Sequence, residues 1–296
     1  MSEVIKSYKG FDKDLKCRGF QYEVGKEYEE PTARACSSGF HACEMPIEVL
    51  SYYEPGKGSR YCEVEQSGKI SKHNEDSKVA SSKIKIGAEI GIPGLVKAQI
   101  EYVKERTTPS GEHHSTGDWS ANSATGDWSA NSATGSRSAN SATGSRSANS
   151  ATGYGSANSA TGDWSANSAT GDWSANSATG YGSANSATGD WSANSATGSR
   201  SANSATGYGS ANVSTGIECS NDAAGERNIA VAWGPDSRCK GILGCFLVLS
   251  EWGTWDGDKH PFFGAKMVEV DGNNIKPDTW YTLKNGKIVI CEEENK

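Results

Sequence analysis

Residues 117–125 have the sequence Gly-Asp-Trp-Ser-Ala-Asn-Ser-Ala-Thr, and residues 126–134 repeat it without change. The unit Gly-x-x-Ser-Ala-Asn-Ser-Ala-Thr then recurs with little drift, and its Thr-Gly junction returns in steps of nine up to Thr215-Gly216. Fixed self-similarity at a short period is typical of repeat architectures, in which each unit stacks on the next. This stretch therefore predicts the architecture of the middle of the chain.

The composition of the repeat leaves two structural alternatives, disorder and a β-solenoid. Residues 116–216 contain no Leu, Ile, Phe or Met, so they cannot form an ordinary hydrophobic core. A disordered linker, however, does not need a strict period. In a parallel β-solenoid identical side chains stack about 4.8 Å apart, and Asn side chains hydrogen-bond along the axis. We therefore expect a solenoid, with the unit's Gly in the turn, where a positive φ is cheap.

The small side chains also predict the cross-section of this solenoid. A three-sided coil of about 27 residues would enclose an interior that only Val, Ile or Leu could fill at native density. Ala, Ser and Thr favour a flat, two-sided roll of roughly 18 residues per coil, with about six coils over a length of roughly 30 Å. The unit's two alanines cannot both point inward on a straight strand, because strand side chains alternate. A bend near Asn122 is one solution.

The two positions after each glycine vary, and they hold Asp-Trp, Ser-Arg or Tyr-Gly. They follow the turn, so they are expected to project from the edges of the roll. Exposed Trp, Tyr and Arg side chains dominate binding hot spots. The alternative is that they stack on one another and stabilise the edge of the roll, with Arg over Trp as a cation–π pair. The candidate binding residues are Trp119, Trp128, Arg137, Arg146, Tyr154, Trp164, Trp173, Tyr181, Trp191, Arg200 and Tyr208.

The whole chain is expected to be mainly β, with the solenoid flanked by two smaller units. We assign an α+β domain to 1–105, a junction to 106–115, the solenoid to 116–216 and a β-rich cap, with an oligomerisation role, to 217–296. Asn285-Gly286 is a strong hairpin signal. The expected strands cover 5–11, 19–24, 60–66, 82–92, 245–251, 265–270, 280–283 and 288–291, and the expected helices cover 44–53 and 92–105.

Charge and composition exclude several classes of function. The formal net charge of −7 does not favour general nucleic-acid binding, which needs clustered Lys and Arg. No apolar signal region and no stretch of about 18 apolar residues is present, so membrane insertion is not expected. The eight Cys are then expected to be reduced in a cytoplasm, or in a protein released with a virion. No cofactor is expected.

One group of soft ligands deserves a metal-binding hypothesis. Cys17, Cys36, His41 and Cys43 lie within 27 residues and are the kind and number of ligands that a structural Zn²⁺ uses. Their spacing matches no standard zinc knuckle. The alternative is that these cysteines are buried free thiols.

A second group has the order Arg18, Ser37-Ser38, then Glu63-x-Glu65 on a predicted strand. This order resembles ADP-ribosyltransferases of the arginine-modifying type. The resemblance implies that Glu65 stabilises a ribosyl cation and that Arg18 binds the nicotinamide dinucleotide. A carboxylate beside developing positive charge is an effective catalytic device. The alternative for Glu63 and Glu65 is an ordinary strand with its polar face to water.

Three stretches of the N-terminal region are distinctive: Cys36-Ser-Ser-Gly-Phe-His-Ala-Cys43, Ser51-Tyr-Tyr53 and Ser59-Arg-Tyr-Cys-Glu-Val-Glu65. Together with the repeats they resemble an uncharacterised family of phage and prophage proteins, which brings no established activity. The repeats also resemble the head β-roll of trimeric autotransporter adhesins. That likeness implies a left-handed roll and a trimer as one candidate oligomer. The signal, stalk and anchor of those adhesins are not found, so surface adhesion is not expected.

These observations favour a non-enzymatic interaction protein. In this hypothesis a rigid solenoid, in a homo-oligomer, displays its edge side chains to a host protein, including a host-defence component, or to a virion protein. The first alternative is an N-terminal domain that binds a nucleotide or acts as an ADP-ribosyltransferase, carried on the rod. The second is a purely structural fibre spacer.

Overall fold

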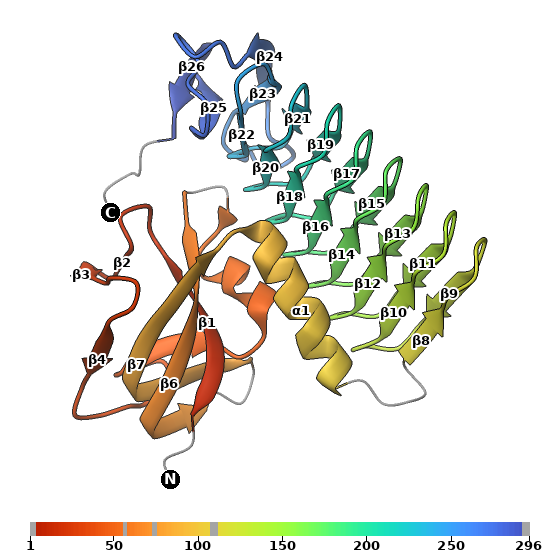
Figure 1. The fold of residues 1–296 in the computed structure, drawn as a ribbon. Coiled ribbons are helices and arrows are strands. Elements are labelled where there is room, and N and C mark those ends of the chain that lie inside the picture. The colour runs from red at the N-terminus through yellow and green to blue at the C-terminus, as the bar shows by residue number, and fades with distance from the viewer. Residues whose placement is uncertain (1–3, 56–57, 73–75, 107–111, 292–296) are drawn as a thin grey trace.

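The computed structural model describes residues 4–55, 58–72, 76–106 and 112–291. The chain is mainly β and consists of an N-terminal domain, a central parallel β-solenoid and a C-terminal sheet region (Figure 1). Residues 107–111 of the expected junction lie outside the described residues.

The solenoid is the two-sided roll that the repeat predicts. Its strands pair in parallel with the strand 18 residues further on, as in Ala130 with Ala148 and Ala139 with Ala157. About eight coils form, more than the expected six, because the pattern continues past residue 216.

One sheet, here called the inner sheet, contains β8 (Glu112–Ser115), β10 (Ala130–Ala133), β12 (Ala148–Ala151), β14 (Ala166–Ala169), β16 (Ala184–Ala187), β18 (Ala202–Ala205), β20 (Ser220–Ala223) and β22 (Arg238–Gly241). The other, the outer sheet, contains β9 (Ala121–Ala124), β11 (Ala139–Ala142), β13 (Ala157–Ala160), β15 (Ala175–Ala178), β17 (Ala193–Ala196), β19 (Ala211–Ser214), β21 (Ile229–Ala232) and β23 (Phe246–Trp252).

The interior of the roll is built on asparagine. Asn158, Asn176 and Asn194 are buried on consecutive outer-sheet strands, and each amide donates to the next one's Oδ1 at 2.9 Å. The same amides also donate to backbone carbonyls of the inner sheet, as Asn176 does to Ser186 at 2.8 Å. Each Asn therefore links neighbouring coils and both sheets. The predicted Asn ladder is confirmed.

The side-chain alternation resolves the question of the two alanines without a bend. Asn122 and Ala124 are buried in β9, whereas Ala121 and Ser123 are exposed, so the strand is regular through Asn122. The eighth residue of the unit points inward and the fifth points outward. On the inner sheet the fifth-place alanines, such as Ala148 and Ala166, are buried from the outside by the N-terminal domain.

The expectation that the unit's glycine adopts a positive φ is wrong. Positive φ values occur two residues later, as at Trp173 (59°) and Arg137 (54°), and at Gly155 (64°) in a Tyr-Gly unit. The first-place glycine is required by stacking instead. A Cβ on Gly171 would lie 2.2 Å from the carbonyl oxygen of Gly153 in the previous coil. Adjacent coils therefore approach too closely at this position for any side chain.

The N-terminal domain is a small antiparallel barrel with a helix. Its sheet has the order β4-β7-β5-β1-β6, and an additional β6–β7 pairing closes the ring. The expected helix over 44–53 is a short 3-10 helix, whereas the expected helix over 92–105 is α1. The elements are β1 (Ile5–Phe11), β2 (Lys16–Cys17), β3 (Phe20–Gln21), β4 (Glu27–Glu29), β5 (Phe40–Cys43), η1 (Pro46–Ser51), β6 (Arg60–Lys72), β7 (Lys78–Ile90) and α1 (Ile92–Arg106).

This domain lies alongside the solenoid and not at its end (Figure 1). Helix α1 crosses the outside of the inner sheet and contacts strands β10, β12, β14, β16 and β18. Leu95 and Val96 of α1 belong to one buried cluster with Ala148 and Ala166 of the solenoid. Because alanine is small, the helix packs close to the sheet. The N-terminal domain therefore covers part of one face of the solenoid.

The C-terminal region closes the last coil with larger apolar residues. Strand β24 (Phe262–Glu269) pairs antiparallel with β23, and β25 (Tyr281–Lys284) pairs with β22 and with β26 (Lys287–Ile290). The β25–β26 turn has positive φ at Asn285 (52°) and Gly286 (66°), as a type I′ hairpin requires. The hairpin predicted from Asn-Gly is therefore confirmed.

Candidate functional site

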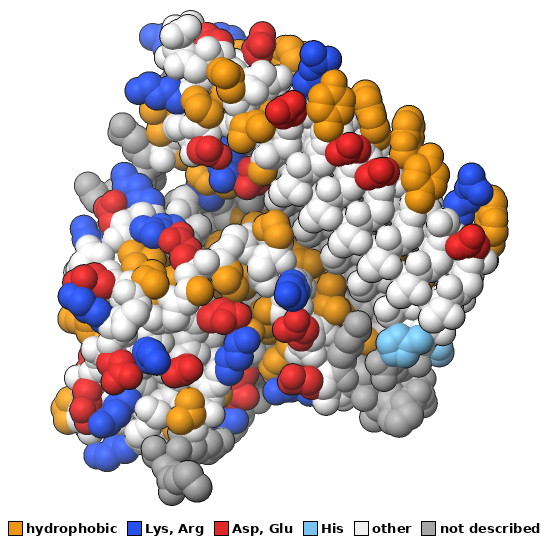
Figure 2. All heavy atoms as spheres, viewed as in Figure 1, with side chains coloured by type: hydrophobic (Ala, Val, Ile, Leu, Met, Phe, Trp, Pro, Cys, Tyr) orange, Lys and Arg blue, Asp and Glu red, His pale blue; other side chains and the backbone are white. Residues whose placement is uncertain are grey.

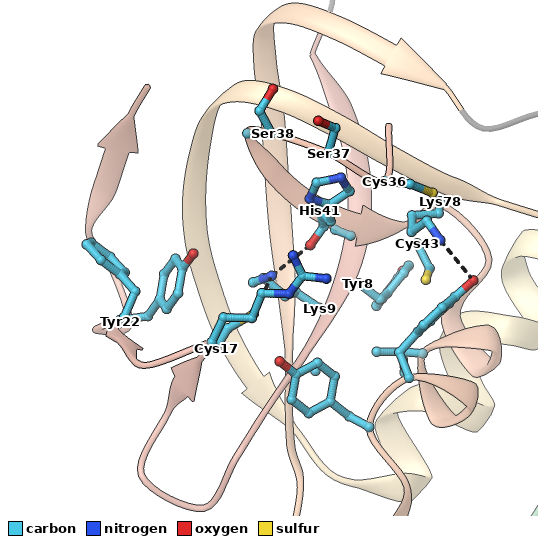
Figure 3. Close-up of a pocket in the computed structure, with 18 of the residues that line it drawn as sticks. Tyr8, Lys9, Cys17, Tyr22, Cys36, Ser37, Ser38, His41, Cys43 and Lys78 are labelled. Carbon is cyan, nitrogen blue, oxygen red and sulfur yellow. Dashed lines mark hydrogen bonds between the residues drawn. The ribbon is translucent and has the colours of Figure 1, made fainter. Parts of the chain in front are cut away.

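Two features of the molecule are candidates for function: a cavity in the N-terminal domain and an aromatic row on the solenoid. The cavity has a volume of about 650 Å³ (Figure 3). It is formed by β1, β2, the 36–39 loop, β5, the residues after η1 and the start of β7. The lining includes Tyr8, Lys9, Cys17, Arg18, Phe20, Tyr22, Glu30, Cys36, Ser37, Ser38, His41, Cys43, Tyr52, Tyr53 and Lys78.

Lys9 of β1 lies in the wall of this cavity and is only 4% exposed. Its amine donates to the carbonyl oxygen of His41 at 2.8 Å and lies 3.5 Å from the Cys17 Sγ (Figure 3). Burial lowers the pKa of Lys9 below its usual 10.5, and the nearby thiols partly oppose this shift. A buried amine held in this way is a candidate for binding or chemistry.

His41 of β5 also lines the cavity. Its Nε2 atom is buried and has no hydrogen-bond partner among the described residues. Burial lowers the pKa of His41, and the positive charge of Lys9 lowers it further. A buried polar side-chain atom without a protein partner is uncommon in folded proteins.

Lys9 was not among the candidate residues predicted from the sequence, although the pattern of the strand contains a signal for it. In β1 the alternating positions Ile5, Ser7, Lys9 and Phe11 share one phase, and all four are buried. A lysine between apolar residues on the buried phase of a strand is unusual, because Lys is almost never fully buried unless it is paired. That pattern predicts an enclosed amine.

The pKa of Lys9 leads to a prediction about stability. Between the lowered pKa and 10.5 the unfolded chain binds a proton at Lys9 that the folded chain does not, so the free energy of unfolding rises with pH there. Lys9→Met removes this contribution. In urea denaturation between pH 7 and pH 10, the free energy of unfolding of Lys9→Met is expected to exceed that of the wild type most at pH 7. This excess is expected to shrink as the pH rises toward 10.5. A stability difference that stays constant with pH would contradict the buried, uncompensated amine.

The four metal-ligand candidates all line the cavity, yet they do not form a metal site. Cys43 is buried, which raises the pKa of its thiol, and Cys36 is exposed in a left-handed turn with φ 61°. Cys17 is half-buried beside Lys9. Within residues 4–55, 58–72, 76–106 and 112–291, no group of three or more His, Cys, Asp or Glu side chains is placed to hold a metal ion. The geometry therefore gives the zinc hypothesis no support.

The residues of the ADP-ribosyltransferase pattern are not brought together. Arg18, Ser37 and Ser38 line the cavity, but Glu63 and Glu65 do not. Glu63 pairs with Lys6 at 3.3 Å, and Glu65 pairs with Lys85 at 3.7 Å, both at solvent-exposed positions. The two glutamates thus occupy the polar face of β6. This is the alternative to a catalytic role, an ordinary strand with its polar face to water.

The variable pairs of the solenoid divide into two edges with different surroundings. The edge that contains Trp128, Arg146, Trp164, Tyr181 and Arg200 is half-buried against the N-terminal domain, and we call it the covered edge. The indole of Trp164 donates to the Ser51 hydroxyl at 3.0 Å, and Arg200 donates to the Ser51 carbonyl at 3.2 Å. Trp128, Trp164 and Arg200 therefore contact the N-terminal domain, whereas Arg146 and Tyr181 pack on their neighbours along the same edge.

The opposite edge, the free edge, contains Trp119, Arg137, Tyr154, Trp173, Trp191, Tyr208 and Arg227. Four of its aromatic residues are 48–72% exposed, and Figure 2 shows a row of hydrophobic side chains along the solenoid's outer rim. The Trp173 and Trp191 rings stack with centroids 5.9 Å apart, and Arg137 lies 4.9 Å from the Trp119 ring centroid. The edge is thus both stacked and displayed.

Aspartates hold the backbone of the free edge in place. Asp172 Oδ1 accepts the backbone N–H of Asp190 at 2.9 Å, and Asp190 accepts that of Tyr208 at 2.8 Å. Charge-assisted bonds of this kind are stronger than neutral ones. The aromatic side chains therefore project from a turn that is fixed to its neighbours.

Comparisons with known proteins found a family model that matches part of the N-terminal region. Residues 5–98 match a domain of unknown function, DUF7666. The match covers β1 to the middle of α1, includes the cavity and does not extend into the solenoid. Searches of curated proteins and of solved structures found no significant match. In the described part of the chain, no helix has the length and apolar character needed to cross a lipid bilayer.

Proposed function

We propose that this chain is a protein-binding scaffold and that the free edge of its solenoid is the binding surface. The observation that carries the proposal is the row of exposed aromatic side chains, with Trp119 at 72%, Trp173 at 59%, Trp191 at 53% and Tyr154 at 48% exposure. Aromatic and arginine side chains are enriched in interface hot spots. The resemblance to phage and prophage proteins makes a host or virion protein the expected partner.

The backbone of the free edge supports a role beyond stacking. Trp119, Trp173 and Trp191 have positive φ values of 55–61°, a conformation that costs a non-glycine residue on the order of 1 kcal/mol. Gly155 and Gly209 occupy the same place in Tyr-Gly units. The turn thus accepts glycine, and its backbone does not need tryptophan. A function that uses the indole gives a reason to keep it.

Stacking also favours binding. Trp191 packs against Trp173 at 5.9 Å and edge-on against Tyr208 at 5.5 Å between ring centroids. Side chains that are already ordered lose less conformational entropy when a partner binds. A rigid, regularly spaced row is therefore a prepared contact surface.

The contrast between the two edges gives the sharpest experiment. The triple variant Trp119→Ser, Trp173→Ser and Trp191→Ser keeps the inner sheet and its contact with the N-terminal domain. A partner is first co-purified with tagged wild-type protein from its natural cells and is then produced in pure form. This partner is expected to bind the triple variant at least about tenfold more weakly than it binds the wild type. A control variant, Trp255→Ser with Met267→Ser, removes similarly exposed apolar side chains elsewhere.

The outcomes distinguish binding at a specific surface from non-specific hydrophobic binding. The control variant should bind the purified partner with wild-type affinity. If the triple variant is folded by circular dichroism and its Kd is unchanged, the free edge is not the binding surface. The expected homo-oligomer stays a prediction, and native mass spectrometry of the wild type measures it.

A further inference from the structure

The charges around the N-terminal cavity are unbalanced. Four cationic or basic residues line it, Lys9, Arg18, His41 and Lys78, whereas Glu30 is the acidic residue in the lining. Lys78 pairs with Asp76 at 3.3 Å, outside the lining. In a chain with a net charge of −7, this gathering of positive groups is not a consequence of composition. Cavities lined by one sign of charge attract ligands of the opposite sign.

Two of these groups have no full set of partners. No carboxylate of the described residues pairs with Lys9. Its amine contacts a carbonyl oxygen and a thiol, and it lies 5.5 Å from the ring centroids of Phe11 and Tyr22. The Nε2 of His41 is buried without a hydrogen bond in the described part of the chain. A buried ammonium is costly unless an opposite charge compensates it. An anionic group placed beside Lys9 would supply that charge.

Aromatic rings form much of the remaining wall. Phe20 and Tyr22 stand edge-on at 4.9 Å between ring centroids, and Tyr8, Tyr52 and Tyr53 also line the cavity. Such rings pack favourably against another planar ring, and their hydroxyl groups offer hydrogen bonds. The volume of about 650 Å³ is that of a small-molecule site.

We propose that this cavity binds a small molecule in which a phosphate or carboxylate group is attached to a planar aromatic part. The anionic group lies at Lys9, and the aromatic part packs against the tyrosines. Two sources share this chemistry, a nucleotide and an aromatic carboxylic acid. The site is separate from the free edge, so each proposal stands or fails without the other.

The first test is calorimetric titration of the full chain with two complete probes and their parts. Adenosine 5′-monophosphate and 4-hydroxybenzoate represent the two sources, and adenosine, inorganic phosphate and phenol are the parts. We expect one complete probe to bind with a Kd below about 1 mM, and its parts to bind at least tenfold more weakly. Absence of binding by both complete probes, or equal binding by the parts, would overturn the proposal.

The second test uses two lysines of the same strand. Lys9→Met removes the buried amine, whereas Lys6→Met removes an exposed lysine that pairs with Glu63. The expected result is at least a tenfold loss of affinity for the bound probe with Lys9→Met, and wild-type affinity with Lys6→Met. Wild-type affinity in a folded Lys9→Met protein would exclude the proposed role of Lys9.

A third measurement needs no variant, so it holds even if Lys9→Met does not fold. Cys17 is half-buried in the cavity wall. A saturating probe is expected to slow the alkylation of Cys17 by iodoacetamide, measured by peptide mass spectrometry. The alkylation of Cys291, which is half-buried in the C-terminal region, should not change. An unchanged rate at Cys17 would place the bound probe outside this cavity.

Discussion

Gly171→Ala is expected to destabilise the solenoid by on the order of 3 kcal/mol, because the added methyl group meets a neighbouring backbone. The ideal Cβ position lies 2.2 Å from the Gly153 carbonyl oxygen and 2.5 Å from its carbonyl carbon. A backbone cannot rotate away as a flexible side chain can. The two coils would have to separate, and the hydrogen bonds between them would lengthen. Thermal and urea denaturation, followed by circular dichroism, measure the loss.

Gly117→Ala is the matched control for this prediction. Gly117 occupies the same place of the unit in the first coil of the same edge, and its nearest neighbour beyond the adjoining residues is the Ser120 Oγ, 3.5 Å from the Cβ position. That is an ordinary contact distance, so the change is expected to stay within about 0.5 kcal/mol. An equal loss of stability in both variants would show that the close approach of coils is not the reason for glycine.

Asn176→Ala is expected to destabilise the protein by about 2–4 kcal/mol, because it removes a buried side chain and three hydrogen bonds. Asn176 donates to the Asn194 Oδ1 at 2.9 Å and to the Ser186 carbonyl at 2.8 Å, and it accepts from Asn158 at 2.9 Å. The substitution breaks the ladder in the middle and leaves a cavity between the sheets. Differential scanning calorimetry is expected to show a lower Tm.

Ser177→Ala tests the same strand on its other face. Ser177 is exposed on the outer sheet, and its neighbour Asn176 is 2% exposed. The stability of Ser177→Ala should stay within about 0.5 kcal/mol of the wild type. If Asn176→Ala is no more damaging than Ser177→Ala, the polar interior does not hold the coils together.

The repeat was predictable because each of its residues acts through its identical neighbours. A strict period, small residues and no large apolar side chain imply a thin two-sided coil, and the Asn ladder follows from stacking. The role of glycine was not predictable in the same way. A short turn and a close approach of two coils both demand glycine, and a sequence does not distinguish them. The structure does, through the close approach of Gly171 to the Gly153 carbonyl group.

The candidate site was predictable only in part. Cys17, Cys36, His41 and Cys43 were one hypothesis for a zinc site, with buried free thiols as the alternative, and all four line one cavity. Their mutual geometry depends on strands that pair across long separations, such as Tyr8 with Cys43. Spacing along the chain therefore could not show that they fail to form a metal site, or that a buried lysine lies in the wall of the same cavity.

The sequence by itself determined the local, repeating part of this protein: a solenoid of 18-residue coils with a ladder of Asn side chains and the variable pairs at the edges. Only the tertiary structure decided which edge remains exposed. Trp119 and Trp128 stand in identical units, yet one is 72% exposed and the other packs near Tyr102 of α1, with ring centroids 6.1 Å apart. The reason is physical. Stacking is a nearest-neighbour interaction that every unit carries in its own residues. The docking of a separate domain depends on the shape and charge of two complete surfaces.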